Sequence, residues 1–187
     1  KRTPASKSIT VVSGDLLDDP RRVLESTLVN EVDTVFHLAA AIPKTAAPVP
    51  GAQYIKANTE ATLSLLEWAQ QNGVRRFFYM SSISVLGSPA TQPIRQDQSS
   101  APQSAYALSK LGGELACELA GRSGLSTISA RLSSPYGAGM SISSVIPAMT
   151  ASALAGSKFG WMGSGKRAQD FVHVSDVVRC AVALAGS

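Results

Sequence analysis

Short apolar segments alternate with helical patterns along this chain, and that alternation restricts the fold more than any other feature. The segments typical of buried strands are residues 9–12, 33–38, 76–80 and 127–132, with a shorter one at 171–174. Helical patterns cover about residues 20–29, 52–71, 106–120 and 144–155, and a last one follows the expected cap Ser175. Strands that are apolar throughout are buried on both faces, as in parallel sheets covered by helices. With right-handed crossovers, this order predicts an α/β protein with a doubly wound parallel sheet.

The carboxyl ends of the predicted strands carry small and polar residues. In doubly wound sheets, ligands bind in the crevice beyond these ends. We therefore expect the residues that follow the strands to lie on one rim and to share one ligand site. They are Asp15, Ala39, Ala40, Ser81, Ser82, Ser133 and Ser134.

Tyr106 and Lys110 lie four residues apart in a predicted helix, and side chains at this spacing share one helix face. An ammonium beside a phenol favours the phenolate and lowers a pKa that is normally about 10. Such a Tyr can take a proton from an alcohol, which the Ser82 hydroxyl could hold in place. The spacing alone also fits an ordinary surface Tyr and Lys, so the interpretation depends on the other motifs.

Composition and charge exclude several classes of protein. The chain has 187 residues, of which 44% are hydrophobic and 16% charged, and this suits one globular domain. No apolar run approaches the roughly 18–20 residues that span a bilayer, and residues 1–4 lack the apolar stretch of a secretion signal. We expect a soluble cytoplasmic protein with no membrane partner.

The net charge of +4 comes from scattered basic pairs rather than a dense basic stripe, so no nucleic-acid partner is expected. Cys117 and Cys180 lie in apolar helical patterns and match neither a disulfide framework nor a zinc site. They are predicted to be small buried hydrophobes, and no metal site is predicted.

Seven segments, taken in order, are similar to the motifs of one family. They are GDL at 14–16, HLAA at 37–40, Asn58 within NTEAT, SSISVLG at 81–87, YALSK at 106–110, RLSSPYG at 131–137 and QDFVHVSD at 169–176. On these segments the chain resembles the extended short-chain dehydrogenase/reductases, also called the NAD-dependent epimerase/dehydratase family. The resemblance implies a Rossmann-type domain over residues 1–187, NAD or NADP as cofactor, a small-molecule substrate and a homodimer.

The resemblance assigns most strand-end residues to the cofactor. Asp15 would accept a hydrogen bond from the adenine amino group, and Leu16 would pack beside the ring. Ala39 and Ala40 would let the backbone approach the cofactor closely. These residues also fit structural roles, Asp15 as a turn cap and the alanines in a crowded core. Further implied cofactor contacts are Asn58, Ser81, Tyr106, Lys110 and Pro135.

The resemblance also implies a catalytic set. Ser82, placed five residues before Gly87, matches the family's catalytic Ser or Thr, while Ser84 is a competing candidate for this role. Tyr106 would remove the proton of a secondary alcohol while hydride passes to the nicotinamide. Lys110 would hold the nicotinamide ribose, and Ser82 would steady the developing carbonyl oxygen.

The two histidines are predicted to be structural rather than catalytic. His37 ends an apolar strand, and His173 lies between Val172 and Val174. We therefore expect both rings to occupy core or structural positions.

The chain departs from the family pattern at both ends. It has no GxxGxxG motif, which in the family opens the domain and binds the pyrophosphate, and it stops soon after Asp176. We therefore expect an incomplete sheet and weak dinucleotide binding by residues 1–187 alone. A natural short chain that pairs with a second subunit is an alternative. The choice between NAD and NADP is left open, because it depends on the end of a strand that is at most partly included.

Three residues are implied to contact substrate: Ser82, Ser134 and Gln169. Gln169 and Ser134 stand where many sugar-nucleotide enzymes have Arg and Asn, and Gln cannot offer a guanidinium fork to a phosphate. Lys166 or Arg167 could compensate. Both substitutions count against a nucleotide-sugar substrate.

The sequence predicts an NAD(P)-dependent epimerase or dehydrogenase/reductase that acts on a secondary alcohol or ketone of a nucleotide-sugar or related small molecule. Sugar 4,6-dehydratases carry Asp-Glu after the catalytic Thr, whereas Ile83 and Ser84 follow Ser82 here, so that reaction is not expected. The alternative is a non-catalytic dinucleotide-binding sensor or scaffold. The presence of Tyr106 beside Ser82 and Lys110 counts against it, because a pure binder needs no phenol.

Overall fold

The computed structural model describes residues 9–16, 24, 32–43, 50–88, 92–160, 164 and 168–186. The chain divides into two compact units, residues 1–131 and residues 132–187. The first unit is built on a three-stranded sheet and the second on a two-stranded sheet.

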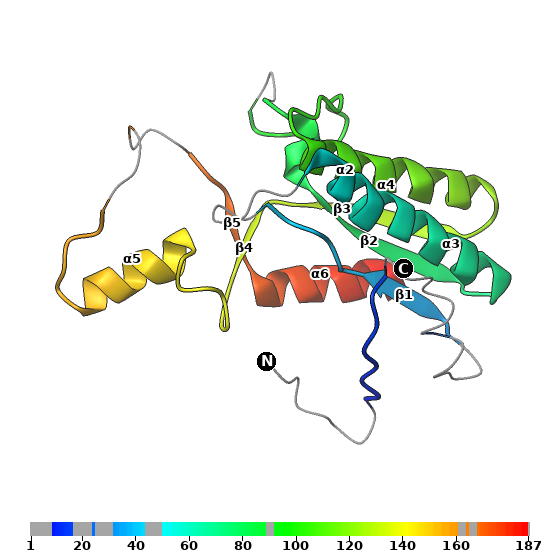
Figure 1. Cartoon of the computed structure of the whole chain (residues 1–187), viewed down its shortest axis with the longest axis horizontal. Helices are drawn as coiled ribbons and strands as arrows, with labels where there is room; N and C mark the ends of the chain where they lie inside the picture. Colours follow the sequence, from blue (N-terminus) through cyan, green and yellow to red (C-terminus); the bar gives the residue numbers. More distant parts are fainter. Residues whose placement is uncertain are drawn as a thin grey trace. The chain divides into compact units, whose positions relative to one another are not determined.

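The sheet of the first unit contains three of the expected strands (Figure 1). β1 covers Thr34–His37, β2 covers Arg76–Ser82 and β3 covers Ser126–Leu132, in the spatial order β1-β2-β3. β1 and β2 run parallel, with Val35 opposite Phe77. These three runs are strands, as expected, but only β2 is largely buried, whereas β1 and β3 are mostly half-buried or exposed.

The helix expected over residues 52–71 is present but not uniform. It consists of α2 (Gly51–Tyr54), a π-helical segment η1 (Ile55–Glu60) and α3 (Ala61–Gln71). Apolar periodicity does not reveal the π-helical segment, because the helix continues through its wider turns. Such segments are rare and often lie at functional sites, and this one contains the buried Asn58.

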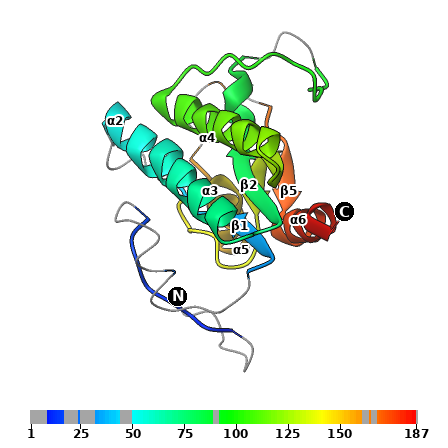
Figure 2. The ribbon, with the colours of Figure 1, turned by 90° about the vertical axis from the view of Figure 1, so that its right-hand side faces the viewer.

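The core of the first unit lies between the sheet and two helices, α3 and α4 (Ala105–Arg122). A short 3₁₀ helix, η2 (Ile83–Leu86), follows β2. α4 begins at Ser104, whose Oγ accepts a hydrogen bond from the Ala107 N–H at 3.1 Å. α3 and α4 lie side by side against the sheet (Figure 2). The buried residues between them and the strands include Leu66, Trp68, Ala69, Phe77, Tyr79 and Cys117.

One expected strand of the first unit is absent. Residues 9–12 are predicted as a strand, but the structure has none there, and Ile9, Val11 and Val12 are exposed. Backbone N–H and C=O groups of a strand need a neighbouring strand, and no described strand pairs with this segment. The helix expected over 20–29 lies outside the described residues, apart from Leu24.

The second unit contains β4 (Ser134–Tyr136), α5 (Val145–Leu154), β5 (Phe171–His173) and α6 (Val174–Gly186). β4 and β5 pair in parallel. The sequence predicts β5 and both helices but misses β4. A segment of three residues around Pro135, which has no backbone N–H to donate, resembles a loop.

The start of α6 differs in one detail from the expectation. Ser175 is predicted as the N-cap, but α6 begins at Val174. The His173 ring is responsible, because its Nδ1 accepts a hydrogen bond from the Ser175 N–H at 3.3 Å. The histidine thereby satisfies a donor of the first turn that a capping side chain would otherwise bind.

Both cysteines are free. Cys117 is buried as expected, whereas Cys180 is exposed, because α6 buries Ala181 and Ala185 instead. None of the helices in the described ranges is long and apolar enough to cross a membrane. Among the same residues, no three His, Cys, Asp or Glu side chains gather where a metal ion could bind.

Candidate active site

Ser82 and Tyr106 meet at the carboxyl end of β2. Ser82 is the last residue of β2, and Tyr106 lies in the first turn of α4. The Ser82 side chain acts on the Tyr106 phenol in the direction that lowers its pKa. The Tyr54 ring packs edge-on against the Tyr106 ring, with centroids 6.0 Å apart. The fold therefore brings together the two hydroxyls that the sequence assigns to one site.

The pKa of Tyr106 corrects one expectation. Burial raises the pKa of the Tyr106 phenol, and the Ser82 side chain opposes that rise. Lys110, expected to lower this pKa, instead places its Nζ 4.4 Å from the centre of the Tyr79 ring. The spacing of Tyr106 and Lys110 defines a shared helix face, but it does not fix the direction of a flexible four-carbon side chain.

Lys110 is a buried cation without an ion-pair partner in the described part of the chain. The residue is 3% exposed, and its Nζ contacts the face of Tyr79. Burial lowers the pKa of Lys110 to about 8, while the Glu114 carboxylate acts in the opposite direction. Because burying an unpaired charge is unfavourable, the ammonium is suited to a ligand that offers oxygen acceptors.

Asn58 connects the loop after β1 to α4. Its Oδ1 accepts a hydrogen bond from the Ala41 N–H at 2.7 Å, and its Nδ2 donates to the Ala41 carbonyl at 3.0 Å. Nδ2 also donates to Ser109 Oγ at 2.9 Å, and Ser109 Oγ donates to the Tyr106 carbonyl at 2.8 Å. Both amide protons of Asn58 are therefore used within the protein. Its contact with a cofactor stays a prediction.

An ion pair that the sequence analysis did not identify lies next to this site. Arg131 donates from Nε to Glu114 Oε1 at 3.0 Å and from Nη2 to Oε2 at 2.8 Å. The Ser81 hydroxyl donates a hydrogen bond to the same carboxylate. Its proton is therefore used within the protein, and its contact with a cofactor stays a prediction. The pair ties α4 to the ends of β2 and β3. In the sequence, Glu114 could have been noticed because it lies four residues after Lys110, on the same helix face.

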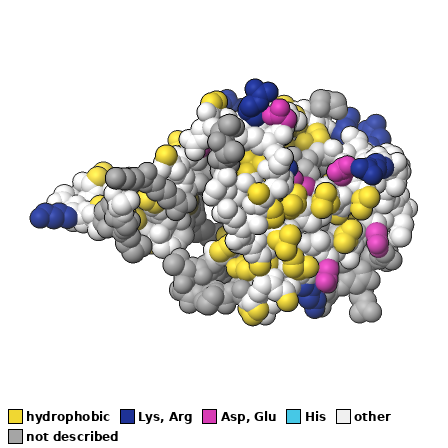
Figure 3. Space-filling model, turned by 90° about the horizontal axis from the view of Figure 1, so that it is seen from above, with side chains coloured by type: hydrophobic (Ala, Val, Ile, Leu, Met, Phe, Trp, Pro, Cys, Tyr) yellow, Lys and Arg dark blue, Asp and Glu magenta, His cyan; other side chains and the backbone are white. Residues whose placement is uncertain are grey.

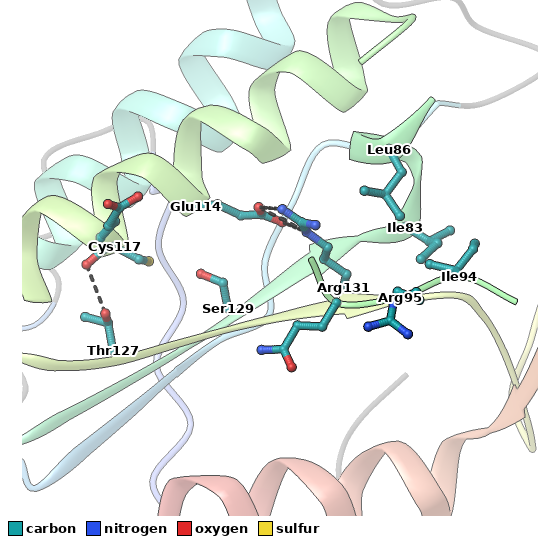
Figure 4. Close-up of a pocket in the computed structure, with 11 residues that line it drawn as sticks. Ile83, Leu86, Ile94, Arg95, Glu114, Cys117, Thr127, Ser129 and Arg131 are labelled. Atoms are coloured by element: carbon teal, nitrogen blue, oxygen red, sulfur yellow. Dashed lines mark hydrogen bonds and ion pairs between the residues drawn. The ribbon is translucent and has the colours of Figure 1, made fainter. Parts of the chain in front are cut away.

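A pocket of about 610 Å³ lies beside this ion pair. Figure 4 shows Glu114 and Arg131 pointing toward one another from α4 and β3, with Ile83 and Leu86 of η2 nearby. The residues that line it include none of the predicted catalytic or cofactor-binding residues. The pocket is therefore separate from the contact between Ser82 and Tyr106.

The residues implied to bind the rest of the cofactor lie in irregular segments. Asp15 is exposed and Leu16 is half-buried. Ala39 is exposed and Ala40 is half-buried, and both follow β1 after Leu38. Their roles toward a cofactor stay predictions.

Two predicted substrate residues contact each other in the second unit. Gln169 Nε2 donates a hydrogen bond to Ser134 Oγ, because pairing of β4 with β5 brings the two segments together. Pro135 is exposed in the middle of β4. Lys166 and Arg167 lie outside the described residues. The contacts of Ser134, Gln169 and Pro135 with ligands stay predictions.

Both histidines have structural contacts, as expected. His37 is 3% exposed, and its Nε2 lies 2.9 Å from Thr62 Oγ1. His173 packs edge-on against Tyr136, with ring centroids 5.2 Å apart, and its Nδ1 lies 2.7 Å from Ser175 Oγ.

The burial of His37 makes stability depend on pH. Burial, with a smaller effect of the Lys110 charge, lowers the pKa of His37 from 6.5 to about 4. Between these values the unfolded chain binds a proton that the folded chain excludes, so stability falls as pH falls through this window. The expected loss in the free energy of unfolding is on the order of 3 kcal/mol.

Chemical denaturation from pH 7 to pH 4 should show this fall in the free energy of unfolding in the wild type and in His173→Gln, and a smaller fall in His37→Gln. An equal fall in all three would contradict it.

Comparison with known proteins supplies the context for this site. A model of the NAD dependent epimerase/dehydratase family matches residues 1–187. A dTDP-glucose 4,6-dehydratase from Actinoplanes sp. is 31% identical over 176 residues, which are 94% of this chain and 54% of the relative. The chain spans about half the length of the curated relatives it matches, 54% and 51% of the first two.

Solved structures give the same result. A UDP-N-acetylglucosamine 4-epimerase from Methanobrevibacter ruminantium M1, in complex with UDP-N-acetylmuramic acid, is similar with a TM-score of 0.86 and 26% identity. The match covers 99% of this chain and 60% of that protein. A UDP-glucuronic acid 4-epimerase from Bacillus cereus, in complex with UDP-glucuronic acid and NAD, has a TM-score of 0.77 and 25% identity over 93% of this chain and 55% of its own. With Rossmann-type neighbours and a family match along its whole length, the chain belongs to the NAD dependent epimerase/dehydratase family.

Proposed function

We propose that the protein is an NAD(P)-dependent epimerase or oxidoreductase that acts on a secondary alcohol of a nucleotide-sugar. The contact between the Ser82 side chain and the Tyr106 hydroxyl carries this proposal. Lys110, one helical turn along the same face of α4, supplies a buried ammonium, which lies over the Tyr79 ring. This set of a hydroxyl donor, a phenol and an ammonium is suited to removing a proton from an alcohol.

Each of the three residues has a step in the proposed reaction. Ser82 donates a hydrogen bond to the alcohol oxygen and steadies the carbonyl oxygen that develops from it. Tyr106 takes the hydroxyl proton and returns it in the reverse direction. Lys110 turns from the Tyr79 ring toward the ligand, where its charge favours the phenolate of Tyr106. NAD, when bound, supplies the acceptor for the hydride of the oxidised carbon.

The residues of this chain fit part of a dinucleotide site. The Lys110 ammonium lacks an ion-pair partner among the described residues, which suits the hydroxyl oxygens of a ribose. Ala39 and Ala40 follow β1 with side chains small enough for close approach. We propose that residues 1–187 belong to the Rossmann-type domain of an extended short-chain dehydrogenase/reductase. Because the 187 residues contain no GxxGxxG motif, we expect them to bind NAD weakly by themselves.

Nucleotide-sugars are the proposed substrate class because the similar structures contain UDP-linked sugars. The hydrogen bond between Gln169 and Ser134 gives the second unit a pair of neutral polar groups in place of an Arg. Ser84 occupies a position where sugar 4,6-dehydratases carry an acidic residue, which favours epimerisation or reduction over dehydration.

The substrate class and the reaction can be tested together. We expect the protein, supplied with NAD, to convert at least one of UDP-glucose, UDP-N-acetylglucosamine, UDP-glucuronic acid and dTDP-glucose. Proton NMR of the sugar distinguishes an inverted hydroxyl from a stable ketone or a 4-keto-6-deoxy product. A protein that binds NAD but converts none of these sugars would favour the non-catalytic sensor or scaffold.

We further propose a homodimer that forms through α3 and α4. Leu108, Leu115 and Leu119 of α4 share one outward face and are 52%, 53% and 60% exposed, and Leu63 of α3 is 40% exposed. Figure 3 shows hydrophobic side chains gathered on the side of the molecule that carries these helices. An exposed apolar patch of this kind is typical of an interface.

The dimer predicts a simple change in mass. Wild-type protein should sediment as a dimer, and Leu115→Glu combined with Leu119→Glu should sediment as a monomer, because two charges would be buried in the interface. Leu154→Glu is the matched control, since Leu154 is 84% exposed on α5. A wild-type monomer, or a double variant that remains dimeric, would exclude this interface.

A cytoplasmic location is proposed as well. Cys117 and Cys180 are both free, as in proteins from reducing compartments. An exposed thiol such as that of Cys180 persists more readily there than in an oxidising compartment.

A further inference from the structure

Ser84 makes two hydrogen bonds to a single atom, Ser82 Oγ. The Ser84 backbone N–H donates to it at 3.2 Å, and the Ser84 hydroxyl donates to it at 2.9 Å. A serine hydroxyl offers one proton and two lone pairs. Ser84 therefore occupies both acceptor positions of Ser82 and leaves its proton as the only group that Ser82 can still use.

The remaining proton of Ser82 is free to interact with the Tyr106 phenol. Ser82 acts to lower the pKa of Tyr106, as a donor to the phenolate oxygen would. Hydrogen bonds in a chain polarise one another, so donation from Ser84 makes Ser82 a stronger donor.

The turn that holds Ser84 is fixed by its surroundings. Ser82 is extended, and η2 begins directly after it, which places Ser84 above Ser82 Oγ. Val85 and Leu86 are 0% and 2% exposed, so they anchor η2 in the core. Gly87 ends η2 with φ +63°, and a Cβ there would lie 2.1 Å from the Ala101 carbonyl oxygen. The position of Ser84 is therefore set by packing on both sides.

We propose that Ser84 is a positioning residue that fixes Ser82 as a hydrogen-bond donor, toward the Tyr106 oxygen in the free protein and toward the substrate oxygen when substrate is bound. This inference rests on the proposed function for its effect on turnover. Its structural part, the direction of the Ser82 proton, can be measured without substrate. A residue that only accepts hydrogen bonds at position 84 would reverse that direction, because Ser82 would then donate to it.

The direct test is the ionisation of Tyr106, followed by NMR of protein labelled at tyrosine ¹³Cζ. The chain has four tyrosines, and Tyr106→Phe assigns the signal. In Ser84→Ala the ionisation midpoint of Tyr106 should move to higher pH, and in Ser84→Thr it should stay at the wild-type value because the hydroxyl is kept. Ser88→Ala is the matched control, because the Ser88 hydroxyl is exposed and hydrogen-bonds Gln103 at 3.3 Å, away from Ser82.

Turnover supplies the second measurement. In Ser84→Ala, kcat should fall about tenfold, equivalent to about 1.4 kcal/mol, with KM unchanged. The acidic limb of the pH profile, along which Tyr106 loses its proton, should move to higher pH. Ser84→Thr should restore kcat. A structural defect would lower the folded fraction without moving the pH profile.

An unchanged Tyr106 midpoint in Ser84→Ala, with Ser82→Ala shifting it, would overturn the inference and leave the proposed function intact. A shifted midpoint in a protein that converts no nucleotide-sugar would support the inference and overturn the function. If Ser84→Ala does not fold, Ser84→Cys gives the same comparison, since a thiol is a weak donor.

Discussion

Replacing Tyr106 with Phe is expected to lower kcat by about 10²–10⁴-fold while leaving NAD affinity unchanged. The substitution removes only the phenolic oxygen, which is the atom that Ser82 contacts and that exchanges the substrate proton. Proton transfer by a positioned side chain contributes about that factor to catalysis. The ring contact with Tyr54 is retained, so the fold should not change. Steady-state assays with the converted nucleotide-sugar, alongside calorimetric titration with NAD, give the two quantities.

The paired measurement separates a catalytic loss from a structural one. A drop in both kcat and NAD affinity would indicate that Tyr106 supports the fold of the site rather than the chemistry. Turnover within about twofold of wild type would refute its assignment as the acid/base, since a lost proton transfer has a much larger effect.

Replacing Gly113 with Ala is expected to lower the free energy of unfolding by about 3 kcal/mol. Gly113 lies where α4 crosses β2, and a Cβ there would be 2.3 Å from the Tyr79 hydroxyl oxygen. Tyr79 is 0% exposed, and its ring contacts the Lys110 ammonium. Moving Tyr79 aside would therefore disturb the packing of the core and cost free energy. Urea denaturation monitored by circular dichroism measures the change.

Gly121→Ala in the same helix is the matched control. Its new Cβ would be 3.1 Å from Thr127 Oγ1, a contact that a small shift relieves. Because Ala favours helix by up to about 1 kcal/mol over Gly, this variant should be as stable as wild type or slightly more stable. Equal stability of Gly113→Ala and wild type would mean that α4 does not sit on Tyr79 as described.

The fold was predictable where local patterns determine it. The apolar runs at 33–38, 76–80 and 127–132 become strands because they pair in one sheet. Only β2, in the middle of that sheet, is largely buried. Residues 9–12 have the same pattern and remain outside any strand, since strand formation depends on a neighbour that local sequence does not specify. The short β4 was missed for a related reason, because its pairing with β5 is a contact between distant segments.

The candidate site was predictable in its residue types but not in its contacts. The resemblance of the segments at 81–87 and 106–110 to the family's motifs, added to the end of the strand and the helical spacing, predicted that Ser82 and Tyr106 act in one site. The direction of the Lys110 side chain was not, because its torsions respond to the Tyr79 ring. The pairing of Glu114 with Arg131 needs α4 and β3 to be placed side by side, which periodicity alone does not provide.

Formation of NADH on the protein is the measurement that tests the central claim most directly. The claim is that Ser82, Tyr106 and Lys110 together remove a proton from a nucleotide-sugar alcohol while its carbon is oxidised. Stopped-flow absorbance at 340 nm, after mixing NAD-loaded protein with the converted sugar, should show NADH in the wild type and none in Tyr106→Phe. An equal NADH signal in both proteins, or none from a wild-type protein that binds both ligands, would contradict the account.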